Sequence, residues 1–252
     1  MKTALITGSS KRVGRGLALG LAARGYAIAV HYHQSKGPAQ GLVNEIAAQG
    51  GMAQAFGADL SSVSETEKLI PSVARALGAP ACLINNASTF DYDSAAHFTS
   101  SQWDEQINTN LRAPALLCRD MAAALPKGQT GCIINLLDQK IDNLNPEFFS
   151  YTVSKIALEA VTRLMAQALA PLIRVNAIAP GLTLPSGAQT EEQFEETRAR
   201  LLLPETSSVE AITKAALYLL DASSVTGQVI FVDGGERLQG VRDYGDTIKP
   251  NK

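Results

Sequence analysis

The sequence alternates short apolar runs with longer segments of helical periodicity, and this alternation restricts the fold more than any other feature. The apolar runs are rich in Val, Ile, Leu and Ala and lack the polar alternation of a strand with one wet face. Such runs are typical of strands that are buried on both faces of a parallel sheet. We expect strands over residues 3–7, 27–32, 53–58, 81–85, 131–137, 173–178 and 229–232. Helical segments between them cover residues 14–24, 38–49, 65–77, 103–125, 151–171 and 210–220.

Strands and helices in this order predict a doubly wound α/β fold, that is, a Rossmann-type parallel sheet with helices on both faces. No repeat or linker divides the chain, so we predict a single domain over residues 1–240 and a polar C-terminal tail over residues 241–252. The segment 181–200 is polar and rich in turn residues, and its acidic second half has helical character. Whether this segment is a mobile loop over a site stays open.

The composition excludes several classes of function. Hydrophobic residues make up 46% of the chain and charged residues 18%, which fits a compact globular protein. The net charge is −2, and no Lys- or Arg-rich block marks a nucleic-acid or membrane surface. No apolar run is long enough to span a bilayer or to form a signal-peptide core. Cys82, Cys118 and Cys132 lack metal-ligand spacing and fit no disulfide framework, so we expect buried thiols in a cytoplasmic protein without a metal.

A dinucleotide site is indicated where the first predicted strand ends, at Thr7-Gly8-Ser9-Ser10-Lys11-Arg12-Val13-Gly14. Glycines let the backbone approach a pyrophosphate, and the following helix N-terminus favours its charge. An NAD site usually offers a carboxylate after the second strand, but residues 30–35 contain none. Arg12, with Lys11 beside it, and Ser35 instead favour the 2′-phosphate of NADP(H). The alternative is that Arg12 is only a solvated loop charge.

Polar residues also follow the third and fourth predicted strands. Asp59 either accepts a hydrogen bond from an adenine amino group or caps the next turn. Asn86 lies where ligands collect in open α/β sheets. The histidines at 31, 33 and 97 lack metal-ligand spacing and are interpreted as cofactor-edge or surface residues. The predicted cofactor site therefore comprises Gly8, Arg12, Val13, Gly14, His33, Gln34, Ser35, Asp59, Leu60, Asn86 and Ala87.

Tyr151 and Lys155 lie one turn apart on the same face of a predicted helix. A lysine ammonium near a phenol favours the phenolate, so such a pair can exchange protons near neutral pH. The pattern is common by chance, but here it follows a buried strand and accompanies a cofactor loop. It therefore indicates a catalytic pair.

At this point the chain resembles the short-chain dehydrogenase/reductase family over residues 1 to about 238. The resemblance implies that Asn110, Tyr151 and Lys155 form a proton relay, and that Lys155 also holds the nicotinamide ribose. It also implies that Tyr151, Pro180 and Gly181 belong to the cofactor site, and that the protein is a homotetramer. The matching motifs stand in family order: Thr7-Gly8 with Gly14, Asp59, Asn85-Asn86-Ala87, Asn110, Tyr151 with Lys155, Pro180-Gly181, and Asp233-Gly234-Gly235.

Three departures from the family pattern carry information about the substrate. Arg12 replaces the middle glycine of the cofactor turn, Ser88 replaces a usual Gly, and Asp138 stands where most members carry a Ser. That Ser donates a hydrogen bond to a substrate carbonyl, whereas an ionised Asp cannot donate and repels a developing alkoxide. Asp138 fits a substrate that presents N–H donors or needs a proton on nitrogen. The alternatives for Asp138 are a helix N-cap or an ion pair with Lys140.

These departures resemble the pteridine reductase branch of the family, which includes the bacterial dihydromonapterin reductases. The resemblance implies that Phe90 stacks on a flat pterin opposite or beside the nicotinamide; the alternative is that Phe90 fills a loop core. Phe148 occupies a position where the branch often has Tyr, so a hydrogen bond from that phenol is lost. The implied substrate residues are Arg12, Ser88, Phe90, Asp138, Phe148 and Tyr151.

The sequence therefore predicts NADPH-dependent reduction of a dihydropterin to its tetrahydro form. Dihydromonapterin, dihydrobiopterin and dihydrofolate stay open as substrates. A first alternative is an NADPH-dependent reductase of the same family that acts on a carbonyl or sugar-like substrate. A second is a non-catalytic NADP(H)-binding regulator, against which the intact Asn110, Tyr151 and Lys155 count.

Overall fold

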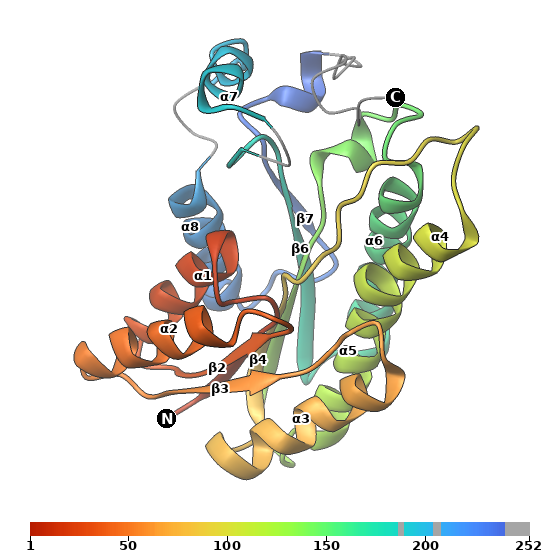
Figure 1. Cartoon of the computed structure of the whole chain (residues 1–252). Coiled ribbons are helices and arrows are strands. Elements are labelled where there is room, and N and C mark those ends of the chain that lie inside the picture. The colour runs from red at the N-terminus through yellow and green to blue at the C-terminus, as the bar shows by residue number, and fades with distance from the viewer. Residues whose placement is uncertain (186–188, 204–207, 240–252) are drawn as a thin grey trace.

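A sheet of parallel strands runs through the protein in the order β3-β2-β1-β4-β5-β6-β7 (Figure 1). The computed structural model describes residues 1–185, 189–203 and 208–239. Its seven strands are β1 (Thr3–Ile6), β2 (Ala27–Tyr32), β3 (Ala53–Gly57), β4 (Pro80–Asn85), β5 (Gly131–Leu136), β6 (Ile173–Pro180) and β7 (Val229–Val232). This arrangement confirms the predicted doubly wound fold.

Helices cover both faces of the sheet, as Figure 1 shows. One face carries α1 (Arg12–Ala22), α2 (Lys36–Ala48) and α8 (Val209–Asp221), and the other carries α3 (Val63–Leu77), α5 (Ala113–Ala124) and α6 (Phe149–Leu169). Residues of one strand alternate between the two apolar layers: Ala4 and Ile6 of β1 pack toward α1, while Leu5 packs toward α5. The three cysteines are buried and unpaired, as predicted.

The predicted helix over residues 103–125 is interrupted. The structure has α4 (Ser100–Ile107), then a π-helical turn η1 (Asn108–Arg112), and then α5. Apolar periodicity does not distinguish a π turn from an α turn, so it did not indicate this interruption. Such turns occur frequently at functional sites, and this one contains Asn110.

The polar segment after β6 contains the helix α7 (Glu191–Arg198), which confirms the helical character expected there. Residues 186–188 of this segment and the predicted tail at 241–252 lie outside the described residues, so the tail and the domain boundary stay predictions. Short 3-10 helices follow β5, as η2 (Gln139–Asp142), and β7, as η3 (Glu236–Gln239). Within the described residues, no helix is long and apolar enough to cross a membrane.

Close packing of α1 on α8 depends on small residues. A Cβ atom added at Gly20 would lie 2.5 Å from Thr213 Cγ2, a separation that real Cβ atoms do not adopt. By contrast, a Cβ atom added at Gly41 on α2 would meet no atom within 4 Å. These two helical glycines therefore differ in what an added methyl group would do.

We expect Gly20→Ala to destabilise the protein by about 1–3 kcal/mol, because overpacking forces the two helices apart. Gly41→Ala should stabilise it by about 0.4–1 kcal/mol, because alanine loses less backbone entropy on folding. Urea unfolding of the two variants measures both effects. Equal effects of the two substitutions would contradict the close contact between α1 and α8.

Candidate active site

Two adjoining cavities open at the carboxyl edge of the sheet. The glycine-turn cavity, of about 620 Å³, lies at the ends of β1, β2, β3 and β4, and the tyrosine cavity, of about 610 Å³, lies at the ends of β5 and β6. Residues that line both cavities are Arg12, Val13, Asn86 and Ser88. An extended ligand can therefore occupy both without crossing bulk solvent.

The predicted site residues divide between these cavities. Those that line the glycine-turn cavity are Gly8, Arg12, Val13, Gly14, His33, Gln34, Ser35, Asp59, Leu60, Asn86 and Ala87. Those that line the tyrosine cavity include Ser88, Phe90, Asp138, Phe148, Tyr151, Lys155, Pro180 and Gly181. Asn110 alone among the predicted residues lines neither cavity and is fully buried.

The turn after β1 is held rigidly. Gly8 has a φ of +61°, and a Cβ atom at Gly14 would lie 2.7 Å from Asn86 Nδ2. The Asn86 amide donates hydrogen bonds to the carbonyl oxygens of Thr7 (2.8 Å) and Gly8 (3.2 Å). The turn therefore leaves its backbone open to a ligand at the N-terminus of α1, where negative charge is favoured.

Arg12 adopts a left-handed conformation, with a φ of +52°, at the position where the family usually has glycine. For a non-glycine residue this conformation costs about 1–3 kcal/mol. The guanidinium donates a hydrogen bond to Pro185 O (2.9 Å), beyond the end of β6. Lys11, in contrast, lines the glycine-turn cavity only. Both side chains line the glycine-turn cavity, so the partner of the 2′-phosphate stays a prediction.

His31 supports the glycine turn from inside the protein. Its Nδ1 accepts a hydrogen bond from Gly8 N–H (2.9 Å), and its Nε2 lies 3.1 Å from Ala58 O, so the ring is neutral with its proton on Nε2. Burial lowers the pKa of His31 to about 4. His31 is 2% exposed but lines the glycine-turn cavity, so of the two interpretations the surface residue is wrong and the cofactor-edge residue fits the structure.

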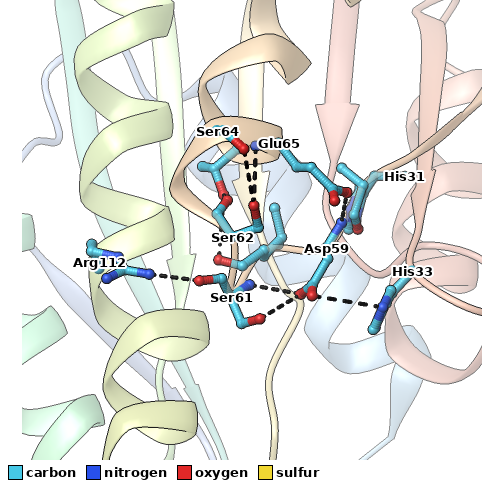
Figure 2. Close-up of polar contacts among 11 residues, drawn as sticks. His31, His33, Asp59, Ser61, Ser62, Ser64, Glu65 and Arg112 are labelled. Atoms are coloured by element: carbon cyan, nitrogen blue, oxygen red, sulfur yellow. Dashed lines mark hydrogen bonds and ion pairs between the residues drawn. The ribbon is translucent and has the colours of Figure 1, made fainter.

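Asp59 lies at the end of β3 and fixes the turn that follows (Figure 2). Its Oδ1 accepts hydrogen bonds from Ser61 N–H (2.9 Å) and Ser61 Oγ (2.8 Å), and its Oδ2 lies 4.0 Å from His33 Nε2. Partial burial opposes ionisation, but the hydrogen bonds from Ser61 and the nearby His33 lower the pKa of Asp59 overall. Asp59 thus caps the turn, one of the two predicted roles, while it also lines the glycine-turn cavity.

Asp138 and Tyr151 form a direct pair in the wall of the tyrosine cavity. The Tyr151 hydroxyl donates a hydrogen bond to Asp138 Oδ2 (2.8 Å), and Asp138 Oδ1 accepts one from the backbone N–H of Lys140 (2.8 Å). Removal from bulk water raises the pKa of Asp138, although the hydrogen bonds and the lysine charges oppose this shift. Asp138 is therefore an N-cap, as one alternative predicted, and also a partner of Tyr151.

Lys155 lies behind this pair. Its Nζ donates a hydrogen bond to Leu136 O (2.8 Å) and lies 5.5 Å from the centroid of the Tyr151 ring. Burial lowers the pKa of Lys155 to about 8, against the opposing charge of Asp138. An acid with a raised pKa, a phenol and a lysine with a lowered pKa thus share one cavity wall. Such a set can move a proton near neutral pH.

Asn110 is fixed by bonds of its own. Its Oδ1 accepts a hydrogen bond from Thr89 N–H (2.9 Å), and its Nδ2 donates to Thr89 O (3.0 Å) and to Ser154 Oγ (3.2 Å). These bonds connect the π turn to α6 next to Lys155. The role of Asn110 in a proton relay stays a prediction.

Phe90 presents an aromatic surface to the tyrosine cavity. Its ring stacks on that of Phe148, with centroids 4.2 Å apart and an interplanar angle of 7°, and meets Tyr151 edge-on at 4.7 Å. Phe90 is 41% exposed, so it does not fill a loop core. Phe148 is 2% exposed and has a φ of +52°, and its ring covers one face of Phe90.

Several residues of the site were not predicted. The carboxylate of Asp93 accepts the N–H of Ser150 (3.2 Å to each oxygen) and thereby caps the helix that carries Tyr151. Fifty-seven positions in the sequence separate Asp93 from Ser150, and no sequence pattern connects them.

The tyrosine cavity has further residues that were not predicted. Glu236 accepts a hydrogen bond from Leu182 N–H (2.9 Å) beside Gly181. Polar residues on one face of α7 and just after its C-terminal end also line the tyrosine cavity. Their helical spacing in the sequence could have identified them: Gln193, Glu196, Thr197 and Arg200.

Comparisons with known proteins agree with this geometry. The sequence profile described as Enoyl-(Acyl carrier protein) reductase matches residues 8–236. The chain is 30% identical to the 3-oxoacyl-(acyl-carrier-protein) reductase FabG of Staphylococcus epidermidis over 93% of this chain and 98% of that protein. It is also similar to two crystal structures titled FolM Alternative dihydrofolate reductase 1, both in complex with NADP. The Brucella canis structure has 37% identity, a TM-score of 0.89 and 98% coverage of both chains. The Brucella suis structure has 38% identity, a TM-score of 0.91, and coverage of 97% of this chain and 98% of that one.

The buried neutral His31 predicts a pH dependence of stability. Below pH 6.5 an unfolded histidine binds a proton that native His31 does not bind until the pH nears 4. The contribution of His31 is therefore complete above pH 6.5 and is lost as the pH falls toward 4, on the order of 3 kcal/mol in all.

Urea unfolding between pH 7 and pH 4.5 tests this, with His31→Asn as the variant. The Asn side chain retains an acceptor for Gly8 N–H but cannot be protonated, so its stability should fall less steeply with acid. Exposed His97 provides the control, and His97→Asn should keep the wild-type slope. Parallel pH curves for wild type and His31→Asn would contradict the neutral, buried imidazole.

Proposed function

Because this chain belongs to the short-chain dehydrogenase/reductase family, we propose that it reduces a dihydropterin to the tetrahydro form with NADPH. The chain is a nicotinamide-dependent oxidoreductase of that family. The observation that carries the choice of substrate is the hydrogen bond of 2.8 Å from the Tyr151 hydroxyl to Asp138. It puts a carboxyl group where a carbonyl reductase needs a neutral hydrogen-bond donor.

The glycine-turn cavity fits the adenosine half of the cofactor. Gly14 lets the start of α1 pack against the backbone of the turn, which a Cβ atom would prevent, and so the turn brings its N–H groups to the N-terminus of α1, where a pyrophosphate would bind. Asp59 and Leu60 would contact the adenine. Lys11, with His33 and Ser35, would meet the 2′-phosphate, because all three line this cavity and no carboxylate follows β2. The two Brucella structures carry NADP, which supports this assignment.

The tyrosine cavity would hold the nicotinamide half and the pterin. Tyr151 and Lys155 would contact the nicotinamide ribose, and Pro180 and Gly181 the adjoining ring. Bound NADPH supplies a hydride to the carbon of a ring C=N bond. The adjacent nitrogen then takes one proton, so that the bond becomes CH–NH. Asp138 would deliver this proton directly or through water, since the rise in its pKa makes the protonated carboxyl easier to reach than in an exposed aspartate.

Tyr151 would share that proton with Asp138, to which it is already hydrogen-bonded, while Lys155 and Asn110 support the relay. Once ionised, Asp138 accepts N–H bonds from a pterin amino group or ring nitrogen. Phe90 would stack on the flat ring with the face that Phe148 does not cover. Ser88 and Arg12 would bind the polar edge of the ring, and the polar face of α7 would meet its side chain.

A carbonyl substrate is the second candidate, favoured by the similarity to the FabG reductase of Staphylococcus epidermidis. Against it, both Asp138 oxygens accept hydrogen bonds in the structure, and neither offers a donor to a carbonyl oxygen while the group is ionised. Exposed apolar side chains on α6, Ile156 and Leu164, are compatible with a homotetramer, which we propose as the assembly.

The function is tested by NADPH oxidation with dihydromonapterin, dihydrobiopterin and dihydrofolate beside a panel of plain ketones. We expect dihydropterins to be reduced and ketones to be poor substrates. Asp138→Ser should lower kcat/KM for the best pterin by about 10²–10⁴-fold, because proton transfer is lost, while the Kd for NADPH changes less than about twofold. Tyr151→Phe should lower turnover in the same range. Reduction of ketones but of no dihydropterin would contradict the proposal and favour the second candidate.

The cofactor assignment predicts a preference for NADPH over NADH of at least about tenfold in kcat/KM, or about 1.4 kcal/mol. Lys11→Ala should erode this preference, because a charge-assisted contact is lost. The matched variant Arg12→Gly removes the neighbouring cation and also removes the strain of a left-handed backbone at a non-glycine residue. This variant should raise the KM for the pterin and leave the ratio of kcat/KM with NADPH to that with NADH within about threefold of wild type. Equal use of the two cofactors by wild type, or erosion in Arg12→Gly alone, would contradict the assignment.

A further inference from the structure

The glycine-turn cavity is lined in part by two segments from distant parts of the chain, which we call its two walls. One segment, at the end of β3, contributes Asp59 and Leu60, and the other, the π turn, contributes Thr109. Thr109 is 8% exposed, so its position is set by packing. The separation of these walls determines how closely a planar group between them is held.

One side chain connects the walls. Arg112, the last residue of the π turn, donates a hydrogen bond from its guanidinium to Ser61 O at 2.6 Å (Figure 2). Ser61 in turn donates from its N–H and its hydroxyl to Asp59 Oδ1. Figure 2 shows the resulting chain of contacts, which runs from Arg112 through Ser61 and Asp59 to His33.

Arg112 is half-buried, and a charged donor to a carbonyl in such a place makes a stronger bond than a neutral one. We propose that Arg112 is a positioning residue that holds the π turn at a fixed distance from the Asp59 turn and so sets the affinity for the adenine half of the cofactor. The inference rests on the proposed placement of the cofactor but not on the identity of the substrate.

Loss of Arg112 should affect cofactor binding and catalytic turnover differently. Asn110 lies on the same π turn but is fixed by Thr89 and Ser154, and within the part of the chain that the structure describes neither of these forms a hydrogen bond with Arg112. Loss of Arg112 should therefore loosen the adenine end and leave the proton-transfer groups in place. A general loss of structure would instead lower turnover and affinity together.

The experiment measures the Kd of adenosine 2′,5′-bisphosphate, which carries only the adenine half, and of NADPH, by calorimetry. We expect Arg112→Ala to raise both Kd values by about tenfold and the KM for NADPH by a similar factor, with kcat at saturating NADPH within about twofold of wild type. Arg112→Lys keeps a cationic donor and should restore at least half of the lost binding free energy. Arg112→Gln serves as the neutral variant if Arg112→Ala does not fold.

Arg119 provides a matched control. It lies on α5 and also bridges to α3, through a hydrogen bond to Glu67 (3.0 Å), but it does not line either cavity. Arg119→Ala should leave both Kd values unchanged. An unchanged Kd for the bisphosphate in Arg112→Ala and Arg112→Gln, or equal weakening in Arg119→Ala, would overturn the proposal. Failure of the wild type to bind the bisphosphate, with NADPH still bound, would overturn it together with the cofactor placement, whereas failure to reduce pterins would leave it standing.

Discussion

Because its strands are all parallel, the sheet brings every carboxyl end to one edge, and the rest of the site depends on this constraint. The strand order places β1 and β4 side by side at the centre, so the turns after these strands meet there. The amide of Asn86, after β4, therefore reaches the carbonyls of the turn after β1. One continuous cleft results, with a rigid glycine turn at its middle and different chemistry at its two ends.

At one end of this cleft, burial and hydrogen bonding act on the same few groups. Asp138 follows β5, and Tyr151 lies in the first turn of α6. The carboxyl group and the phenol therefore meet only when β5 and α6 are both folded. The cap that Asp93 provides fixes the start of that helix. Removal from water raises the pKa of Asp138 and lowers that of Lys155, so both shifts move the groups toward neutral pH. A carboxyl so tuned can give a proton to nitrogen, and the same carboxyl when ionised binds N–H donors.

Local features of the site could be predicted from the sequence, because they depend on residues close together in the chain. The strands followed from apolar runs, and the positions of Gly14, Asp138 and Tyr151 followed from motifs that each span a single strand end or helix turn. Contacts between distant segments could not be predicted in this way. The burial of His31 depends on the backbone groups of Gly8 and Ala58 that satisfy its ring.

Departures from regular geometry were also invisible in the sequence. The π turn at residues 108–112 has the same apolar spacing as an α-helix. The left-handed backbone of Arg12 could not be predicted either, because arginine rarely adopts that conformation. The direction of the Arg12 guanidinium follows from that backbone and from Pro185, which lies far along the chain. The sequence therefore did not show that Arg12 lines both cavities whereas Lys11 lines only one.

In the proposed reaction, Asp138 acts on the nitrogen of a pterin ring held against Phe90. A crystal structure of the protein with NADP⁺ and a bound dihydropterin would show this contact. We expect an Asp138 carboxyl oxygen within about 3 Å of a pterin ring nitrogen or amino group, with the ring stacked on the open face of Phe90. A pterin bound elsewhere, or a ring in the tyrosine cavity with no nitrogen in reach of Asp138, would contradict it.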